Sequence, residues 1–119
     1  MIRVAIRWCA IEAYDKRVFS ASSDVWAFGV TLWEIMSYGA KPYSAVEPKE
    51  VRRKVREGLR LAKPRGCPAE VFQMLTGCFA VDPSERPTFM ALRAEIQMYL
   101  RNASQKEGSR DVALVARSM

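Results

Sequence analysis

The fold of this chain is decided by residues 23–36, which read S-D-V-W-A-F-G-V-T-L-W-E-I-M. The Ser-Asp pair at the start and Gly39 after the end are typical of the two ends of a helix. Large apolar residues lie on every side of this helix, so other parts of the protein must surround it. With Gly29 and Glu34 interrupting it, the segment is too short to span a bilayer, which needs roughly 20 apolar residues. We therefore predict that this segment is a buried central helix in the core of the fold.

Asp24, at the head of this helix, has two possible roles. A carboxylate is favoured at a helix N-terminus, where it meets the free N–H groups and the positive end of the dipole, so Asp24 could cap its own helix. Alternatively, the side chain reaches out of the helix and holds the backbone of another segment. The composition of the segment does not decide between these roles.

The overall composition indicates one globular domain in a reducing compartment. Half of the residues are hydrophobic and 27% are charged, with a net charge of +6, which indicates weak attraction to acidic partners. The three cysteines are widely spaced and the chain has no histidine, so the usual mixed Cys/His zinc site is excluded. Free cysteines without a signal peptide favour a cytoplasmic location.

Several short motifs of the sequence resemble motifs in the C-terminal lobe of protein kinases. Residues 23–30, S-D-V-W-A-F-G-V, resemble the signature of the central helix in that lobe. Residues 37–43, S-Y-G-A-K-P-Y, and residues 82–89, D-P-S-E-R-P-T-F, are similar to tyrosine-kinase motifs and occur in the same order. The sequences of these motifs are most similar to those of the cytoplasmic focal-adhesion and Cdc42-associated tyrosine kinases.

This resemblance covers about residues 4–100 and implies a fold for them. The resemblance implies an all-α fold for residues 1–100: the helical C-lobe portion of the protein-kinase-like fold, built around the buried central helix, from the end of the activation segment to a last helix ending near Leu100. From residue 101 to residue 119 the resemblance ends and the sequence is largely polar, so we predict a disordered tail.

Residues 6–8 resemble the arm that ends the activation segment of tyrosine kinases. In that family the arm lies beside the backbone of the substrate tyrosine. The resemblance therefore implies that Ile6, Arg7 and Trp8 form a substrate-side platform. The motif that follows, at residues 10–12, reads Ala-Ile-Glu, with Ile11 at the position where the family has proline.

Glu12 is the glutamate of this Ala-Ile-Glu motif. On position alone it would be an exposed carboxylate in the first turn of a helix. In the kinase family, however, this glutamate pairs with an arginine near the end of the lobe, and Arg86 occupies the matching position. The resemblance thus implies a structural ion pair between Glu12 and Arg86.

Residues 48–57 predict an amphipathic helix with one strongly basic face. Pro48 suits its first turn, and Val51 and Val55 share the apolar face. The basic side chains of this helix and the following loop are Lys49, Arg52, Arg53, Lys54, Arg56, Arg60, Lys63 and Arg65. No aromatic residues are interleaved for base stacking, so nucleic-acid binding is not expected. A solvated face is the simplest interpretation, and docking of an acidic partner or a phosphopeptide is the alternative.

The elements that carry out phosphoryl transfer in kinases do not occur in these 119 residues. That reaction needs a Gly-rich loop, a strand lysine, the H-R-D base and the D-F-G aspartate for Mg²⁺. The sequence has no histidine, no Gly-rich loop and no Asp-Phe-Gly. We therefore expect no catalytic residue and no ATP, Mg²⁺ or other cofactor bound by this chain alone. In the family Asp24 anchors the H-R-D loop, and without that loop the neighbouring surface of the central helix should lie open.

Three hypotheses about function stay open at this point. The chain is a fragment of a protein tyrosine kinase, inactive alone, whose ATP-dependent phosphorylation of protein tyrosine needs a longer polypeptide. Alternatively, it is a non-catalytic, pseudokinase-like interaction module, or a truncated product without function. In the first two cases the partner is a protein, either a tyrosine-containing substrate or a kinase partner.

Overall fold

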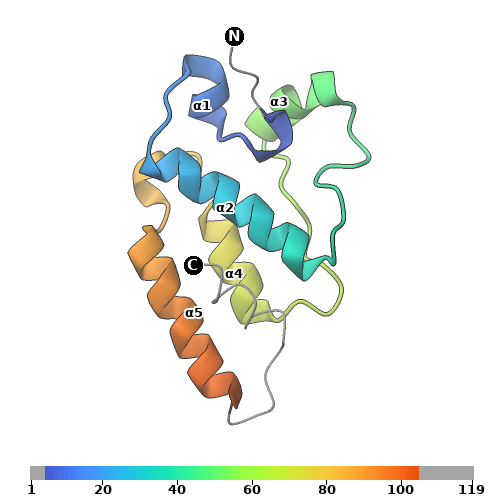
Figure 1. The fold of residues 1–119 in the computed structure, drawn as a ribbon. Helices are drawn as coiled ribbons and strands as arrows, with labels where there is room; N and C mark the ends of the chain where they lie inside the picture. Colours follow the sequence, from blue (N-terminus) through green and yellow to red (C-terminus); the bar gives the residue numbers. More distant parts are fainter. Residues whose placement is uncertain (1–4, 105–119) are drawn as a thin grey trace.

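A computed structural model describes residues 5–104 of the chain. Its elements are η1 (Ile6–Trp8), α1 (Ile11–Lys16), α2 (Ala21–Met36), α3 (Pro48–Arg56), α4 (Ala69–Gly77), η2 (Pro83–Glu85) and α5 (Phe89–Ser104). No strand occurs within residues 5–104, and the all-α prediction is confirmed. Helix α2 crosses the middle of the molecule, with α1 and α3 on one side and α4 and α5 on the other (Figure 1).

Helix α2 begins two residues before the predicted start, and its cap is Ser20. The Ser20 hydroxyl accepts a hydrogen bond from the Ser23 N–H, and the Ser23 hydroxyl accepts one from the Ser20 N–H at 2.8 Å. This reciprocal arrangement satisfies two backbone donors at the helix start. Asp24 is the fourth residue of α2, so the interpretation of Asp24 as the helix cap is wrong. At the other end, Gly39 adopts a φ of 88°, a conformation that glycine adopts without strain.

The core forms where α2 packs against its neighbours. Val25, Trp26, Val30 and Leu32 of α2 are at most 2% exposed, and Leu75 of α4 and Leu92 of α5 are fully buried beside them. Fully burying each of the larger side chains stabilises the fold by about 1.5–3 kcal/mol relative to exposure. The central helix is thus the core element that its apolar sequence predicts.

One stripe along α2 is not covered by the residues that the structure describes. Asp24 and Thr31 are exposed, and Phe28 and Ile35 are only partly buried. These four residues, spaced by three and four positions, share one face of the helix, and we call them the open stripe. The prediction that α2 is surrounded on every face is therefore wrong for this stripe, whereas the opening expected beside Asp24 is present.

The last helix extends further than predicted. Helix α5 runs to Ser104, four residues beyond the expected end at Leu100. Because Tyr99 and Leu100 pack against the core, the helix is still supported at its predicted end. Residues 101–104 are therefore helical rather than part of a disordered tail, and residues 105–119 of the predicted tail lie outside the described residues.

Gly29 of α2 packs tightly against Cys78 and Phe79, the two residues that follow α4. A Cβ atom at Gly29 would lie 2.7 Å from Cys78 Cβ and 2.9 Å from Phe79 Cε1. Alanine has a helix propensity about 1 kcal/mol better than that of glycine, but overpacking a core costs about 1–3 kcal/mol. Since the nearest atom is a Cβ fixed to the backbone, the clash should dominate. We expect Gly29→Ala to lower the free energy of unfolding, measured by urea denaturation.

Gly77, the last residue of α4, provides the matched control. A Cβ at this position would lie 3.7 Å from Pro87 Cδ, which is an ordinary contact. Gly77→Ala should therefore stabilise the chain by about 0.4–1 kcal/mol through a less flexible unfolded state. Equal and favourable effects of both substitutions would contradict the tight packing at Gly29.

Candidate functional site

Arg86 links three separate segments of the chain from a fully buried position. Its side chain is 0% exposed. Two guanidinium nitrogens donate to the two carboxylate oxygens of Glu12 at 2.8 Å each. The same guanidinium donates to the carbonyl oxygens of Ser22 at 3.0 Å and of Ala80 at 2.9 Å. The structure thus brings together the two residues of the predicted ion pair and adds two carbonyl partners that the sequence did not indicate.

Charge and hydrogen bonding favour the ionised form of Glu12. The hydrogen bond from Arg86 lowers the pKa of Glu12 below its ordinary value of 4.5, against an opposing effect of burial. Because the pKa of the folded state lies below that of the unfolded state, this interaction stabilises the fold above the unfolded pKa and is lost as the pH falls through the folded value. The ion pair is therefore complete at neutral pH.

The lowered pKa of Glu12 predicts that the fold loses stability in acid as this carboxylate is protonated. We expect the free energy of unfolding of the natural chain to fall as the pH drops below about 4.5, because the unfolded state then takes up a proton more readily. In Glu12→Gln the stability at neutral pH is lower, and its decline below about pH 4.5 is shallower. Urea denaturation across this pH range measures both slopes, and parallel curves for the two proteins would contradict the assignment.

Trp26 lies between two arginines in the centre of this cluster. The guanidinium carbon of Arg86 is 5.0 Å from the indole centroid, and that of Arg60 is 5.2 Å away. The ring of Phe79 meets the indole edge-on at 5.2 Å. Arg60 also donates to the carbonyl oxygens of Val55 at 2.8 Å and Phe79 at 3.2 Å. Cation–π contacts of this kind add about 0.5–2 kcal/mol each.

Arg7 points into the protein and is not part of an exposed platform. It is 6% exposed and donates to the carbonyl oxygens of Pro42 at 3.2 Å, Tyr43 at 2.7 Å and Val46 at 3.0 Å. The residue therefore fastens η1 to the loop between α2 and α3. The predicted platform role cannot involve its guanidinium group, because that group is already occupied by buried carbonyl oxygens.

Ile6 and Trp8, the other two platform residues, are partly buried. The indole N–H of Trp8 donates to Glu34 Oε1 at 2.6 Å, which orients the ring against α2. A role for Ile6 and Trp8 beside a substrate stays a prediction.

Asp24 carries an exposed side chain. No hydrogen bond or ion pair joins its carboxylate to another residue within residues 5–104. It is therefore free to accept hydrogen bonds from a segment outside this range, as the second interpretation of Asp24 requires, and that anchoring role stays a prediction.

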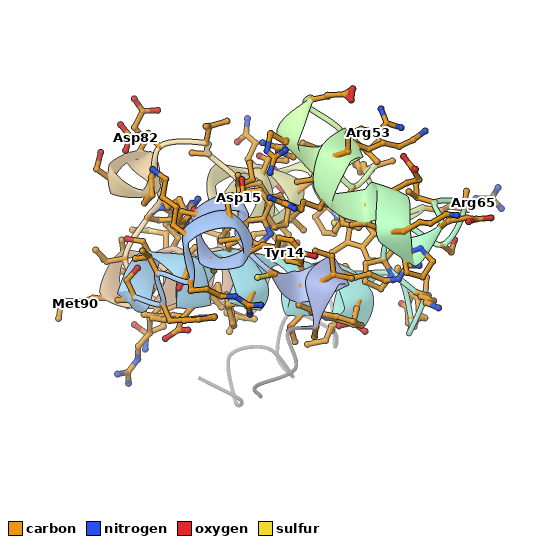
Figure 2. The ribbon with its side chains drawn as sticks, turned by 90° about the horizontal axis from the view of Figure 1, so that it is seen from above. Tyr14, Asp15, Arg53, Arg65, Asp82 and Met90 are labelled. Atoms are coloured by element: carbon orange, nitrogen blue, oxygen red, sulfur yellow. The ribbon has the colours of Figure 1, made fainter. Side chains whose placement is uncertain are left out.

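The basic face of α3 is largely neutralised by carboxylates of this chain. Asp15 of α1 accepts from Arg52 at 2.6 Å and also pairs with Arg56, and Arg53 pairs with Glu57 at 2.7 Å. In Figure 2, Tyr14 and Asp15 lie beside α3, and Arg53 lies on its outer side. Hydrogen bonds from Arg56 and then Arg52 lower the pKa of Asp15. With these arginines paired, a solvated face fits α3 better than a phosphopeptide site does.

The cysteines do not form a reactive or metal-binding site. Cys9, Cys67 and Cys78 are free thiols, and burial raises the pKa of each, that of Cys78 to about 12. Thiols in such surroundings remain protonated at neutral pH. Within residues 5–104, no cluster of three or more His, Cys, Asp or Glu side chains could hold a metal ion. In the same part of the chain, no helix has the length and apolar character to cross a membrane.

Sequence reasoning missed the inward arginines. Arg60 reads as one of eight basic residues on a surface, and Arg7 as part of a platform, yet both guanidinium groups bind backbone carbonyl oxygens. The only signal for Arg60 is its position directly after the apolar Leu59 and before Leu61, which is a weak one. The partners of Arg7 lie 35 to 39 residues away, beyond the reach of any local pattern.

Comparisons of the sequence with known proteins identify its relatives. A family model described as protein tyrosine and serine/threonine kinase matches residues 1–96. The chain is 47% identical over 87 residues to tyrosine-protein kinase RYK of Mus musculus, which covers 73% of this chain and 15% of that protein. It is 40% identical over 100 residues to ephrin type-A receptor 1 of Homo sapiens, covering 84% of this chain and 10% of the receptor.

A third relative extends the similarity over almost the whole chain. The tyrosine-protein kinase transforming protein RYK of avian retrovirus RPL30 is 38% identical over 117 residues, covering 98% of this chain and 26% of that protein. The chain thus spans about a quarter or less of the length of these tyrosine-kinase relatives, and its helices match only the helical C-lobe part of the kinase domain. On its sequence match and its fold, the chain belongs to the protein tyrosine and serine/threonine kinase family.

Proposed function

We propose that these residues form the supporting half of the C-lobe of a protein tyrosine kinase. In this role α2 carries the catalytic loop, which other residues of a longer polypeptide supply, and the 119 residues alone transfer no phosphate. The substrates of the complete enzyme are protein tyrosines, and the domain works in the cytoplasm. The relatives that match are tyrosine kinases, which supports this specificity.

The open stripe of α2 is the observation that carries this proposal. Phe28 and Ile35 are apolar, yet the described residues leave them only partly covered. The stripe continues onto the start of α5, where Phe89 meets Phe28 edge-on at 5.7 Å and Met90 is 82% exposed. Partly exposed apolar side chains on one helix face, beside the exposed Met90, are typical of an interface. Asp24 at its end offers a carboxylate to the backbone N–H groups of a packed loop.

The size of the native polypeptide tests the proposal most directly. An immunoblot of the source, with an antibody raised against residues 48–65, should show a band far above the 13.5 kDa of this chain. A single band near 13.5 kDa would overturn the proposal. That result would favour the alternative, in which the open stripe binds a separate kinase or one of its partners.

Asp24 allows a second test that separates support of catalysis from support of the fold. Because the side chain is exposed, Asp24→Ala in the 119-residue chain should change the free energy of unfolding by less than about 0.5 kcal/mol. In the longer enzyme the same substitution should abolish phosphorylation of a tyrosine-containing peptide. Full activity of that variant would contradict the anchoring role. The 119-residue chain itself should show no thermal shift with Mg-ATP.

A further inference from the structure

A groove of about 420 Å³ lies between α4 and α5, apart from the open stripe of α2. Its walls are formed by Glu70, Gln73 and Met74 of α4 and by Ala94, Glu95, Met98, Tyr99 and Asn102 of α5. Along α5 the lining spans eight residue steps, which is about 12 Å or two helical turns. The groove is within the range of about 300–1,000 Å³ that ligand sites in proteins occupy.

The groove presents flexible apolar side chains to solvent. Met74 is buried at its base, and Met98 is 58% exposed at its edge. Methionine side chains adapt to the shape of an apolar partner and are frequent at surfaces that bind helices. Two packed helices with such a groove between them accept the apolar face of a third helix, whose anchors recur every three or four residues.

The charge of the groove is opposite to that of the chain as a whole. The chain has 19 basic and 13 acidic residues, yet the lining contains two carboxylates, one from each helix, and no lysine or arginine. In the part of the chain that the structure describes, neither Glu70 nor Glu95 takes part in an ion pair, whereas Glu50 and Glu57 on α3 both pair with Arg53. Burial raises the pKa of Tyr99, and the negative charge of Glu70 raises it further. The charge of Glu70 therefore acts on a side chain that lines the groove.

We propose that this groove binds a basic amphipathic helix of another protein. One or two apolar side chains of that helix contact Met74 and Met98, while a lysine or arginine on each side pairs with Glu70 and Glu95. Charge-assisted hydrogen bonds to carboxylates are about twice as strong as neutral ones, so the two glutamates select a cationic partner. This surface does not include Asp24 or the open stripe, so the inference does not depend on the proposed function.

Methyl NMR of the methionines can locate binding on the 119-residue chain. The chain is labelled with ¹³C at the methionine methyl groups and titrated with a synthetic 12-residue helical peptide of leucine, lysine and alanine. We expect the Met74 and Met98 resonances to shift and to saturate. Met90 is 82% exposed near the other end of α5 and Met36 is buried in α2, so these two should not move. Equal shifts at Met90 would overturn the proposal by showing non-specific binding.

Substitutions at the two glutamates test the charge selection. Both side chains are exposed, so the double variant Glu70→Gln, Glu95→Gln should fold normally and bind the peptide at least about tenfold more weakly. The matched control, Glu47→Gln with Glu85→Gln, removes two exposed carboxylates outside the groove and should bind as the natural chain does. Unchanged affinity of the groove variant would overturn the proposal, as would equal binding of a peptide with glutamate in place of lysine.

Discussion

Replacing Arg86 by alanine is expected to remove a large part of the free energy of unfolding of the chain. The substitution leaves the Glu12 carboxylate without its cation and the carbonyl oxygens of Ser22 and Ala80 without their donor. It also opens a space over Trp26. Removing one partner of a buried ion pair costs about 3–5 kcal/mol, and a domain of this size has only about 5–15 kcal/mol of stability in total. Circular dichroism during urea denaturation measures the loss.

Two further variants show whether the geometry or only the charge of Arg86 matters. Arg86→Lys keeps the positive charge but cannot make the paired hydrogen bonds to both oxygens of Glu12, so it should recover only part of the stability. Arg53→Ala is the matched surface control. Although Arg53 pairs with two glutamates, these are exposed pairs, and its loss should cost no more than about 1 kcal/mol. If Arg86→Ala costs no more than Arg53→Ala, the buried pair does not stabilise the fold.

Trp26→Ala is expected to have an effect of similar size through a different mechanism. The indole is 1% exposed, and truncating a buried tryptophan costs about 3–5 kcal/mol because it leaves a cavity. The substitution also removes the ring against which Arg60 and Arg86 are packed. We expect a much lower free energy of unfolding in urea denaturation followed by circular dichroism, and a partial recovery in Trp26→Phe, which keeps an aromatic ring.

Trp33 is the matched control for this substitution. It lies on the same helix but is only partly buried, and its indole N–H donates to the Ala62 carbonyl oxygen at 2.7 Å. Trp33→Ala removes a side chain of the same size together with one hydrogen bond, and should cost clearly less than Trp26→Ala. Equal losses would mean that the contacts with Arg60, Arg86 and Phe79 do not strengthen the packing at Trp26.

The sequence predicts the central helix well because its apolar content admits few alternatives. A helix with Val25, Trp26, Val30 and Leu32 must lie in a core, and it does. The exposure of Phe28 could not be derived from hydrophobicity, since an apolar residue looks the same whether its neighbours are present or absent. Family resemblance was needed to expect an open surface beside Asp24.

The candidate site was predictable only in part. The contact between Glu12 and Arg86 was predicted because two short motifs resemble kinase motifs. Nothing in the spacing of these two residues indicates that they meet. The groove between α4 and α5 escaped sequence reasoning entirely. Glu70 and Glu95 belong to two different helices, and only the packing of those helices brings them to one groove. Similarly, whether a guanidinium points to solvent or to carbonyl oxygens, as in Arg7, depends on a loop far along the chain.

The distance along the chain between Glu12 and Arg86 has a consequence for synthesis on the ribosome. The two residues are 74 positions apart, and translation proceeds at about 5–20 residues per second, so Glu12 emerges about 4–15 s before its partner. For most of that interval α2 is already made, but Arg86, which joins its first turn to α1, is not. The apolar surface of α2 therefore stays incompletely covered until Arg86 and α5 have been made, and in this period the nascent polypeptide is most exposed to aggregation.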